Sequence, residues 1–377
     1  MGSGVCYRAG WRMSYDPEAR RDTPLALRLK ERIRREGPIS AAEFMNICLR
    51  DQDHGYYVTK DAIGAGADFI TAPEISQVFG ELIGLWCAVV WQQMGSPSKV
   101  NLVEWGPGRG TMMRDALRAL KIMPEMLEAV EVRLLEQSAT LTAVQKATLA
   151  GAPATVTWWK LPWDIPKAPT ILVANELLDT FSCKQLVKTE HGWRNRGVGI
   201  GGAEQLVFVE MDEKPEAPIP HNLNSAPTGS IFEYATCGAV ADELPYFAGQ
   251  VLAALFLDYG HMEPGIGETL QALRRHQPEH PLCSPGEADL TVHVNFSEFA
   301  KQARGEDFAI DGPVTQAEFL GRLGIIERAS KLMTANPEKA AEIEAGVARL
   351  IAPNGMGTRF KAIGIRSAGL PPLPGFA

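Results

Sequence analysis

Short apolar runs alternate with helical patterns through the middle of the chain. The runs are too short for helices and indicate buried strands; they cover residues 100–105, 131–135, 170–174 and 251–257. Between the first two, apolar residues recur at helical spacing, at Met113, Ala116, Leu117 and Leu120. This alternation predicts a Rossmann-like α/β fold with a doubly wound, largely parallel sheet.

Two Ser/Thr-x-x-Glu patterns mark predicted helix starts in the N-terminal part. Ser40 with Glu43 opens one helix, and Thr71 with Glu74 opens another. Apolar residues follow the second pattern at helical spacing as far as Gly95. We therefore expect two capping boxes, the second at the start of a long amphipathic helix.

The alternation breaks over residues 184–228. Two strand-like pieces, "KQLVKTE" and "QLVFVEM", flank the glycine-rich "HGWRNRGVGIGGAE", which predicts an inserted β-hairpin followed by a linker. The last part is helical, with a closing strand predicted in "FKAIGIRS". The expected order is a helical N-terminal region, a first core segment, the hairpin insert, a second core segment and a helical C-terminal extension. Their expected limits are 1–95, 96–183, 184–228, 229–300 and 301–377.

The stretch "LVEWGPGRGTMM", residues 102–113, carries Gly106, Gly108 and Gly110 where the first strand turns into its helix. Glycines there let the backbone adopt positive φ and approach a ligand, and the helix start offers free N–H groups. Nicotinamide and flavin enzymes use similar loops, and a tight turn without a ligand is the plain alternative.

Two acids bear on the choice of ligand. Glu104, just ahead of the glycines, would repel a pyrophosphate but would attract the sulfonium and ammonium groups of S-adenosyl-L-methionine. Glu136 ends the second strand, "VEVRLLE", where an acid can accept hydrogen bonds from both ribose hydroxyl groups of either cofactor class. The alternative for Glu136 is an ordinary surface acid at a strand end.

Composition narrows the class further. The net charge of −8 argues against a general nucleic-acid binder, which usually shows a basic face. The six cysteines form no C-x-x-C pair and the histidines lack ligand spacing, which predicts free thiols and no metal site. We find no run long enough to span a bilayer and no signal- or transit-peptide pattern, so we expect a cytoplasmic chain that starts at Met1 or Met13.

Several stretches resemble the MidA family of S-adenosylmethionine-dependent methyltransferases. They are "DHGYY", "DFITAPEISQVFGELIG", "LVEWGPGRGTMMRD", "EQSATL", "ANELLDTF", "LDYG", "DLTVHVNF" and "TQAEFLGRLGI". The chain departs from the family pattern at Ala67, where glycine is usual. The resemblance implies a class I methyltransferase core that forms symmetric dimethylarginine on a subunit of respiratory complex I (NADH dehydrogenase) and aids its assembly. Related eukaryotic members are mitochondrial. Whether the chain forms a homodimer is left open.

The stretch "ILVANELLDTF" places polar residues at the end of the fourth strand, where ligands bind in such sheets. If the chain turns helical there, Glu176 and Asp179 share a face and can hold a guanidinium group bidentately. We expect these two acids to form a guanidinium clamp and Asn175 to orient the substrate or the methionyl part. A solvated loop with acids at a helix start is the alternative.

Further candidates follow from patterns that each have a structural alternative. In "DLTVHVNF" one strand face is expected to be polar and to line a cleft or a hydrogen-bonded network: Asp289, Thr291, His293 and Asn295. His293 is either a proton acceptor or a structural histidine. An indole of Trp158 or Trp159 packs either on adenine or in the core. Asp258 and Tyr259 follow the fifth strand at the ligand edge.

The segment "DFITAPEISQVFGELIG" is more than a methyltransferase core needs. A Gly-Ala-Gly-Ala lead at residues 64–67 before a capped helix suggests a mobile lid, and we expect Thr71, Pro73 and Glu74 to border the cofactor cleft. A plain packing helix is the alternative. Other functions stay open: a nicotinamide-dependent dehydrogenase, a non-catalytic assembly factor that holds a partner, and a methyltransferase for a small molecule or RNA.

Overall fold

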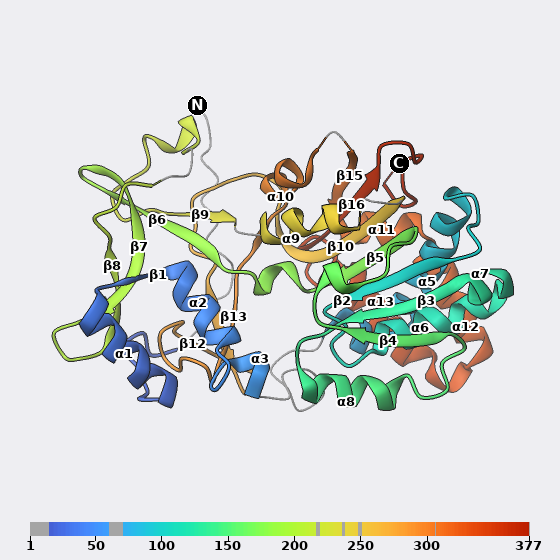
Figure 1. The fold of residues 1–377 in the computed structure, drawn as a ribbon, viewed down its shortest axis with the longest axis horizontal. Coiled ribbons are helices and arrows are strands. Elements are labelled where there is room, and N and C mark those ends of the chain that lie inside the picture. The colour runs from blue at the N-terminus through green and yellow to red at the C-terminus, as the bar shows by residue number, and fades with distance from the viewer. Residues whose placement is uncertain are drawn as a thin grey trace.

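The computed structural model describes residues 15–59, 71–215, 219–235, 238–247, 251–305 and 307–376. The chain forms two lobes (Figure 1). One lobe is built on an eight-stranded sheet, and the other on a five-stranded and a three-stranded sheet together with the N-terminal helices. We call them the core lobe and the accessory lobe.

The sheet of the core lobe has the strand order β15-β16-β10-β5-β2-β3-β4, with β14 paired to β10. Its strands are β2 (Val100–Trp105), β3 (Val130–Leu135), β4 (Thr155–Trp159), β5 (Thr170–Asn175), β10 (Leu252–His261), β14 (Val294–Asn295), β15 (Phe308–Thr315) and β16 (Phe360–Ser367). The strands from β10 to β4 are parallel, whereas β16 is antiparallel to β10 and β15 is antiparallel to β16. This confirms the doubly wound α/β core and the closing strand; β15 was not predicted, because its Gly-Pro step reads as a turn.

Helices cover both faces of this sheet, which is why its central strand β5 is apolar on both faces. In β5, Ile171 and Val173 belong to one hydrophobic cluster and Leu172 and Ala174 to another. The first cluster includes residues of α5 (Gln77–Gln93), α6 (Thr111–Ala119), α7 (Pro124–Ala129), α11 (Gln316–Arg322), α12 (Ile325–Ala335) and α13 (Ala340–Ile351). The second includes residues of α9 (Gly238–Glu243) and α10 (Phe296–Ala303). Helix α8 (Ala139–Thr148) lies beside β4 (Figure 1).

The predicted long helix from Thr71 is two helices, α4 (Ala72–Ile75) and α5. Ser76 between them is extended and its hydroxyl accepts a hydrogen bond from Val78 N at 3.3 Å, so a second cap interrupts the predicted helix. The Thr71 side chain makes no capping bond, so the capping box predicted there is wrong. The first N–H group of that helix, Ala72 N, donates instead to Glu176, which is distant in the sequence.

The other predicted capping box is half formed. Ser40 Oγ accepts from Glu43 N at 3.1 Å and starts α2 (Ala41–Arg50), as predicted. The Glu43 carboxylate pairs with Arg32 at 2.6 Å rather than with the backbone of Ser40. The Glu43 carboxylate therefore forms an ion pair with Arg32 in place of the second hydrogen bond of the capping box.

Two glycines let α5 and α6 pack closely behind the site. A Cβ atom on Gly84 would lie 2.5 Å from Ala116 O, and one on Gly80 would lie 2.8 Å from Asp115 Cβ. The buried carboxylate of Glu81 then pairs with Arg118 of α6 at 2.9 Å. These contacts hold the middle and end of α6 against α5, and the start of α6 forms one wall of the site described below.

The accessory lobe gathers segments that are far apart in sequence. Its sheets have the orders β1-β7-β6-β9, with β8 on β7, and β12-β11-β13. The strands are β1 (Ile39–Ser40), β6 (Cys183–Thr189), β7 (Gly192–Ile200), β8 (Leu206–Glu210), β9 (Ile231–Ala235), β11 (Gln271–Arg274), β12 (Gln277–Glu279) and β13 (Asp289–Thr291). With α1 (Pro24–Glu36), α2 and α3 (Tyr56–Thr59) they enclose a core of their own that includes Leu29, Phe44, Val198 and Leu290.

The segment predicted as a hairpin therefore has a third strand. The glycine-rich stretch between the two predicted strands is β7, which pairs with both β6 and β8. A Cβ atom on Gly197 would lie 2.6 Å from Ile39 O, so glycine is needed here for close packing rather than for a turn. Short 3₁₀ helices lie at Leu120–Ile122, Pro162–Asp164, Leu178–Thr180, His221–Leu223, Leu244–Tyr246 and Pro337–Lys339.

Within the described ranges, we find no helix long and apolar enough to cross a bilayer and no cluster of three metal-binding side chains. Cys48, Cys87 and Cys283 are buried free thiols. The predicted Gly-Ala-Gly-Ala lid lead and Ala67 lie outside the described residues.

Candidate active site

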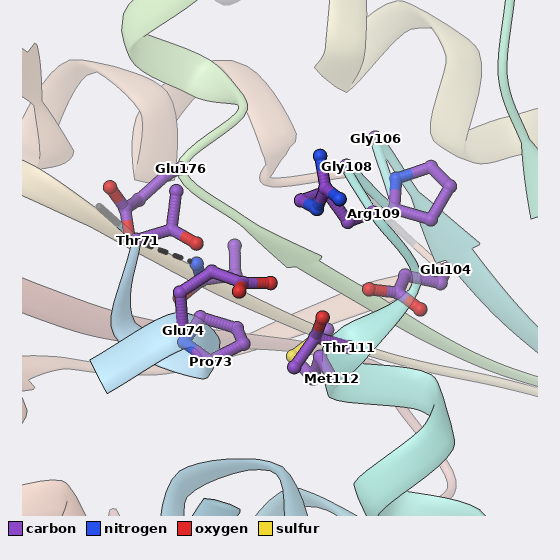
Figure 2. Close-up of a pocket in the computed structure, with 12 residues that line it drawn as sticks. Thr71, Pro73, Glu74, Glu104, Gly106, Gly108, Arg109, Thr111, Met112 and Glu176 are labelled. Carbon is purple, nitrogen blue, oxygen red and sulfur yellow. Dashed lines mark hydrogen bonds between the residues drawn. The ribbon is translucent and has the colours of Figure 1, made fainter. Parts of the chain in front are cut away.

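A cleft opens at the carboxyl ends of β2 and β5, where a ligand of this fold is expected (Figure 2). It holds about 380 Å³ of empty space that is open to solvent. Its lining comprises Thr71, Pro73, Glu74, Glu104, Gly106, Pro107, Gly108, Arg109, Thr111, Met112, Asn175 and Glu176. The start of α4, the glycine loop and the end of β5 thus meet around one space, as predicted for Thr71, Pro73 and Glu74.

The glycine loop connects β2 to α6 in a conformation that other residues rarely adopt. Gly106, Gly108 and Gly110 have φ values of 71°, 55° and 80°. The predicted positive φ is confirmed at all three. Gly106 and Gly108 line the cleft, whereas Gly110 is the residue that immediately precedes α6. The loop can therefore hold a ligand against its backbone.

Glu104 is an uncompensated buried acid beside this loop. Its side chain is only 2% exposed, and Oε2 receives no hydrogen bond from any residue that the structure describes. Burial raises the pKa of Glu104 to about 8. A carboxylate in such surroundings is stabilised by a cation, so the site fits a positively charged ligand and disfavours a pyrophosphate.

Glu136 lies at the end of β3 and does not line the cleft itself. Its two oxygens accept from Ser138 N at 2.7 Å and from Gln145 Nε2 at 2.9 Å. Burial raises the pKa of Glu136, and these hydrogen bonds oppose the rise. The predicted alternative of a plain surface acid does not fit a side chain held at both oxygens.

Glu176 closes the cleft on the side of α4. It follows β5 with φ of 52°, which is uncommon for a residue with a Cβ atom and is often found at functional sites. Oε1 accepts from Ala72 N at 2.9 Å. It also accepts from Asn175 Nδ2 at 3.1 Å, which is the dashed bond in Figure 2. Glu176, not Thr71, therefore satisfies the first N–H group of α4. Burial and the charge of Asp179 raise the pKa of Glu176 to about 7.

Asp179 sits deeper, in the 3₁₀ turn Leu178–Thr180. It is 5% exposed, and burial raises its pKa to about 7. Its Oδ1 receives no hydrogen bond from the described part of the chain, and the same holds for Asn175 Oδ1. The predicted helical turn from Glu176 is wrong, because Glu176 has a left-handed backbone; Asp179 nevertheless lies near enough to raise the pKa of Glu176. Burial of Asp179 excludes the solvated-loop alternative for that residue.

Further polar groups surround Asp179. Asp258 Oδ2 accepts from Asp179 N at 3.2 Å, and Tyr259 forms a hydrogen bond with the Asp179 carboxylate. Burial, followed by the charges of Asp179 and Glu176, raises the pKa of Asp258 well above its ordinary value. Tyr57 donates to Asp289 Oδ1 at 2.9 Å from the accessory lobe. Sequence reasoning missed Tyr57, whose only signal was its place in "DHGYY".

The single polar strand face predicted in "DLTVHVNF" is wrong, because the stretch forms two strands, β13 and β14. Asn295 instead caps α10 by accepting from Glu298 N at 3.2 Å. His293 packs edge-on against Tyr259 at 5.4 Å between ring centroids. Burial lowers its pKa to about 4, which makes it a weak proton acceptor.

A family model of S-adenosyl-L-methionine-dependent methyltransferases matches residues 82–314. The chain belongs to this family. The methyltransferase family predicted from the sequence motifs is thereby confirmed, and the dehydrogenase alternative is excluded. In this family S-adenosylmethionine supplies a methyl group that its sulfonium makes electrophilic.

Named relatives support the same assignment for this methyltransferase. It is 35% identical to the zebrafish (Danio rerio) mitochondrial protein arginine methyltransferase NDUFAF7, over 88% of this chain and 84% of the relative. It is 33% identical to the human (Homo sapiens) protein of that name, over 93% of this chain and 86% of the relative. A crystal structure from Burkholderia thailandensis bound to S-adenosyl-homocysteine has a TM-score of 0.81 and 27% identity, with 94% of each chain covered. The cofactor of this methyltransferase is S-adenosylmethionine.

The residues of the cleft suit that cofactor. We expect Glu104 to face its positively charged methionyl end, the glycine loop to cradle it through the backbone, and Glu136 to bind the ribose hydroxyl groups. Arg109, Thr111 and Met112 also line the cleft and were not predicted individually. Trp158 donates to Gln145 Oε1 at 2.9 Å, while Trp159 donates to Thr157 Oγ1 at 2.9 Å. Trp158, unlike Trp159, is therefore hydrogen-bonded to Gln145, which also donates to Glu136.

Proposed function

We propose that this methyltransferase methylates an arginine side chain of a protein, and that the acceptor is a subunit of respiratory complex I. The observation that carries the proposal is a group of three acids with raised pKa values: Glu176 lines the cleft, and Asp179 and Asp258 are buried behind it. Acids so close together repel one another, and a permanent cation relieves that repulsion. The guanidinium group is such a cation at every physiological pH.

The unsatisfied acceptors strengthen the case for a guanidinium group. Asn175 Oδ1 and Asp179 Oδ1 are buried acceptors without a donor among the described residues. Guanidinium carries five N–H donors in one plane, so it can serve several such oxygens at once. Glu176 and Asp179 would form the clamp, and Asn175 would orient the acceptor nitrogen.

Glu176 is also suited to the proton that methylation releases. When the acceptor nitrogen forms its new N–C bond, it must lose a proton to keep the product's charge at +1. A base is most effective when its pKa lies near the working pH, and the pKa of Glu176 is raised to about 7. His293, with a pKa lowered to about 4, is less suited to this role.

The relatives named as protein arginine methyltransferases support the acceptor class. Symmetric dimethylation, the complex I subunit and a role in its assembly rest on the family resemblance. The cytoplasmic location and a homodimer stay predictions.

The test is mass spectrometry of complex I subunits incubated with S-adenosylmethionine and the purified chain. We expect a methylated arginine with the native protein and none with Glu176→Ala, and no product when that arginine of the acceptor is replaced by lysine. Cofactor binding without any methylated arginine, together with tight binding of a complex I subunit, would favour the non-catalytic assembly factor. Methylation of a small molecule alone would also overturn the proposal.

A further inference from the structure

One fully buried amide on α8 joins three parts of the cofactor side. Gln145 is 0% exposed although it lies outside the cleft lining. Its Nε2 donates to Gly108 O at 2.8 Å and to Glu136 Oε2 at 2.9 Å, and its Oε1 accepts from Trp158 Nε1 at 2.9 Å. Both amide hydrogens and the carbonyl oxygen are therefore in use.

These three bonds fix the amide in one orientation. The side chain must donate to two acceptors and accept from one donor, which glutamine can do from a single terminal group. An acid of the same shape lacks the two donors, and methionine of similar length lacks both donors and the acceptor. This position therefore requires the hydrogen-bonding groups of glutamine, and a side chain of the same volume without them does not replace it.

The helix that carries Gln145 also supports the glycine loop through packing. A Cβ atom on Gly110 would lie 3.6 Å from both Cα and Cγ of Gln145. Loop and helix are therefore in contact at Gly110 and hydrogen-bonded at Gly108. A shift of α8 would be transmitted directly to the backbone that faces the cofactor cleft.

We propose that Gln145 is the positioning residue that aligns Glu136 and the glycine loop for the adenosyl half of S-adenosylmethionine. Each oxygen of Glu136 is held by one donor, Ser138 N or Gln145 Nε2, and keeps a second lone pair. Held in this way, the carboxylate presents both oxygens to the two ribose hydroxyl groups. The proposal rests on that role of Glu136 and is independent of arginine as the acceptor.

The experiment compares two ligands in four proteins by isothermal titration calorimetry. The ligands are S-adenosylhomocysteine and its 2′-deoxy analogue, and the proteins are the native chain, Gln145→Met, Gln145→Glu and Gln92→Met. Gln92 is an exposed glutamine on α5 and serves as the matched control. Thermal melting of each protein checks that the titrated sample is folded.

The native chain and the control should bind S-adenosylhomocysteine more tightly than the deoxy analogue. In Gln145→Met we expect the affinity for S-adenosylhomocysteine to fall about tenfold to a hundredfold, because the hydrogen bonds that hold Glu136 and Gly108 are lost. The preference for S-adenosylhomocysteine over the deoxy analogue should shrink. Gln145→Glu should lose more, because it sets an acid against Glu136 and Gly108 O.

A purely structural role would give a different pattern. Gln145→Met would then melt at lower temperature but keep the native affinity and the native preference per folded molecule, which overturns the proposal. Equal binding of both ligands by the native chain would overturn it as well, because Glu136 would not read the ribose. Neither result bears on the clamp, which is tested by methyl transfer.

Discussion

The acid on the proposed adenosyl side, Glu136, and the acids on the proposed acceptor side differ in how far their carboxylate oxygens are hydrogen-bonded. Glu136 receives a hydrogen bond at each oxygen from its own chain. Glu176, Asp179 and Asp258 instead crowd together, and Asp179 Oδ1 is left without a described donor. The first arrangement suits a neutral ligand with hydroxyl groups, whereas the second is stabilised by a cation.

Glu104 sits on the cofactor side of the cleft but behaves like the acceptor acids. Figure 2 shows it across the cleft from Glu74 and Glu176. Its Oε2 lacks a described donor and its pKa is raised to about 8, as expected for an acid that waits for a cation. Two acids that we expect to meet positive charge, Glu104 and Asp179, thus each keep one oxygen without a described donor, whereas both oxygens of Glu136 are hydrogen-bonded.

The largest effect should come from Glu176→Gln, which keeps the shape and an oxygen for Ala72 N but removes the charge. We expect methyl transfer to fall about 10²–10³-fold, as when a group that stabilises developing charge is lost. Affinity for S-adenosylhomocysteine should stay within about threefold. Turnover and calorimetry measure the two quantities, and Glu125→Gln, an exposed acid on α7, is the control. Equal losses of affinity and turnover would place Glu176 on the cofactor side.

Glu104→Gln should change stability and affinity in opposite directions. Below pH 4.5, its ordinary pKa, Glu104 is protonated in both the folded and the unfolded chain. Between pH 4.5 and about pH 8 it ionises in the unfolded chain but keeps its proton in the folded chain. Glu104 therefore lowers the free energy of unfolding as pH rises through this range. At pH 8 we expect the cofactor-free variant to be more stable by about 1–3 kcal/mol. Its affinity for S-adenosylmethionine should fall about tenfold.

Denaturant unfolding at low and high pH measures the stability difference, which should shrink towards zero as pH approaches 4.5. Glu136→Gln is the comparison variant, and it should give no stabilisation, because both oxygens of Glu136 are hydrogen-bonded. If Glu104→Gln is less stable than the native chain at pH 8, Glu104 has a partner that offsets its burial, and the contrast between the two sides fails.

Tyr259→Phe should shift the pH dependence of methyl transfer. The hydrogen bond from Tyr259 opposes the rise in the pKa of Asp179, so its loss should raise that pKa further above about 7. Because clamping needs the ionised acid, the acidic limb of kcat/KM should move to higher pH, by about half a unit to one unit, with near-native activity at high pH. Tyr246→Phe, on an exposed ring, should leave the profile unchanged. A uniform loss at all pH values would show a packing role only.

Sequence patterns predicted the parts of this protein that local rules decide. The apolar runs located β2, β3, β5 and β10, because a strand buried on both faces is mostly apolar. The glycines between β2 and α6 predicted positive φ, because the backbone freedom of a residue without a Cβ atom is a local property. The position of Glu104 next to them was enough to predict a cationic ligand.

The sequence failed where distant segments meet. The start of α4 looked like a capping box, yet its first N–H group donates to Glu176, 104 residues away. The glycines of β7 looked like a turn, yet Gly197 allows the close approach of Ile39 from the N-terminal region. No window of neighbouring residues contains either partner, so periodicity and capping rules assign them to the wrong local structure.

The smallest effect should come from Thr71→Ala, which tests whether the two sides of the cleft are linked through α4. Ser40 Oγ caps α2, so Ser40→Ala should cost about 1 kcal/mol of unfolding free energy. Thr71 makes no such bond and Glu176 satisfies the helix start, so Thr71→Ala should cost less than about 0.5 kcal/mol. Because Thr71 lines the cleft, its loss should weaken S-adenosylhomocysteine binding by about twofold to fivefold. Thermal melting and calorimetry on both variants separate the two effects. An equal loss of stability in both, with native affinity, would mean that Thr71 serves only the helix and that the segment before α5 is scaffold rather than cleft wall.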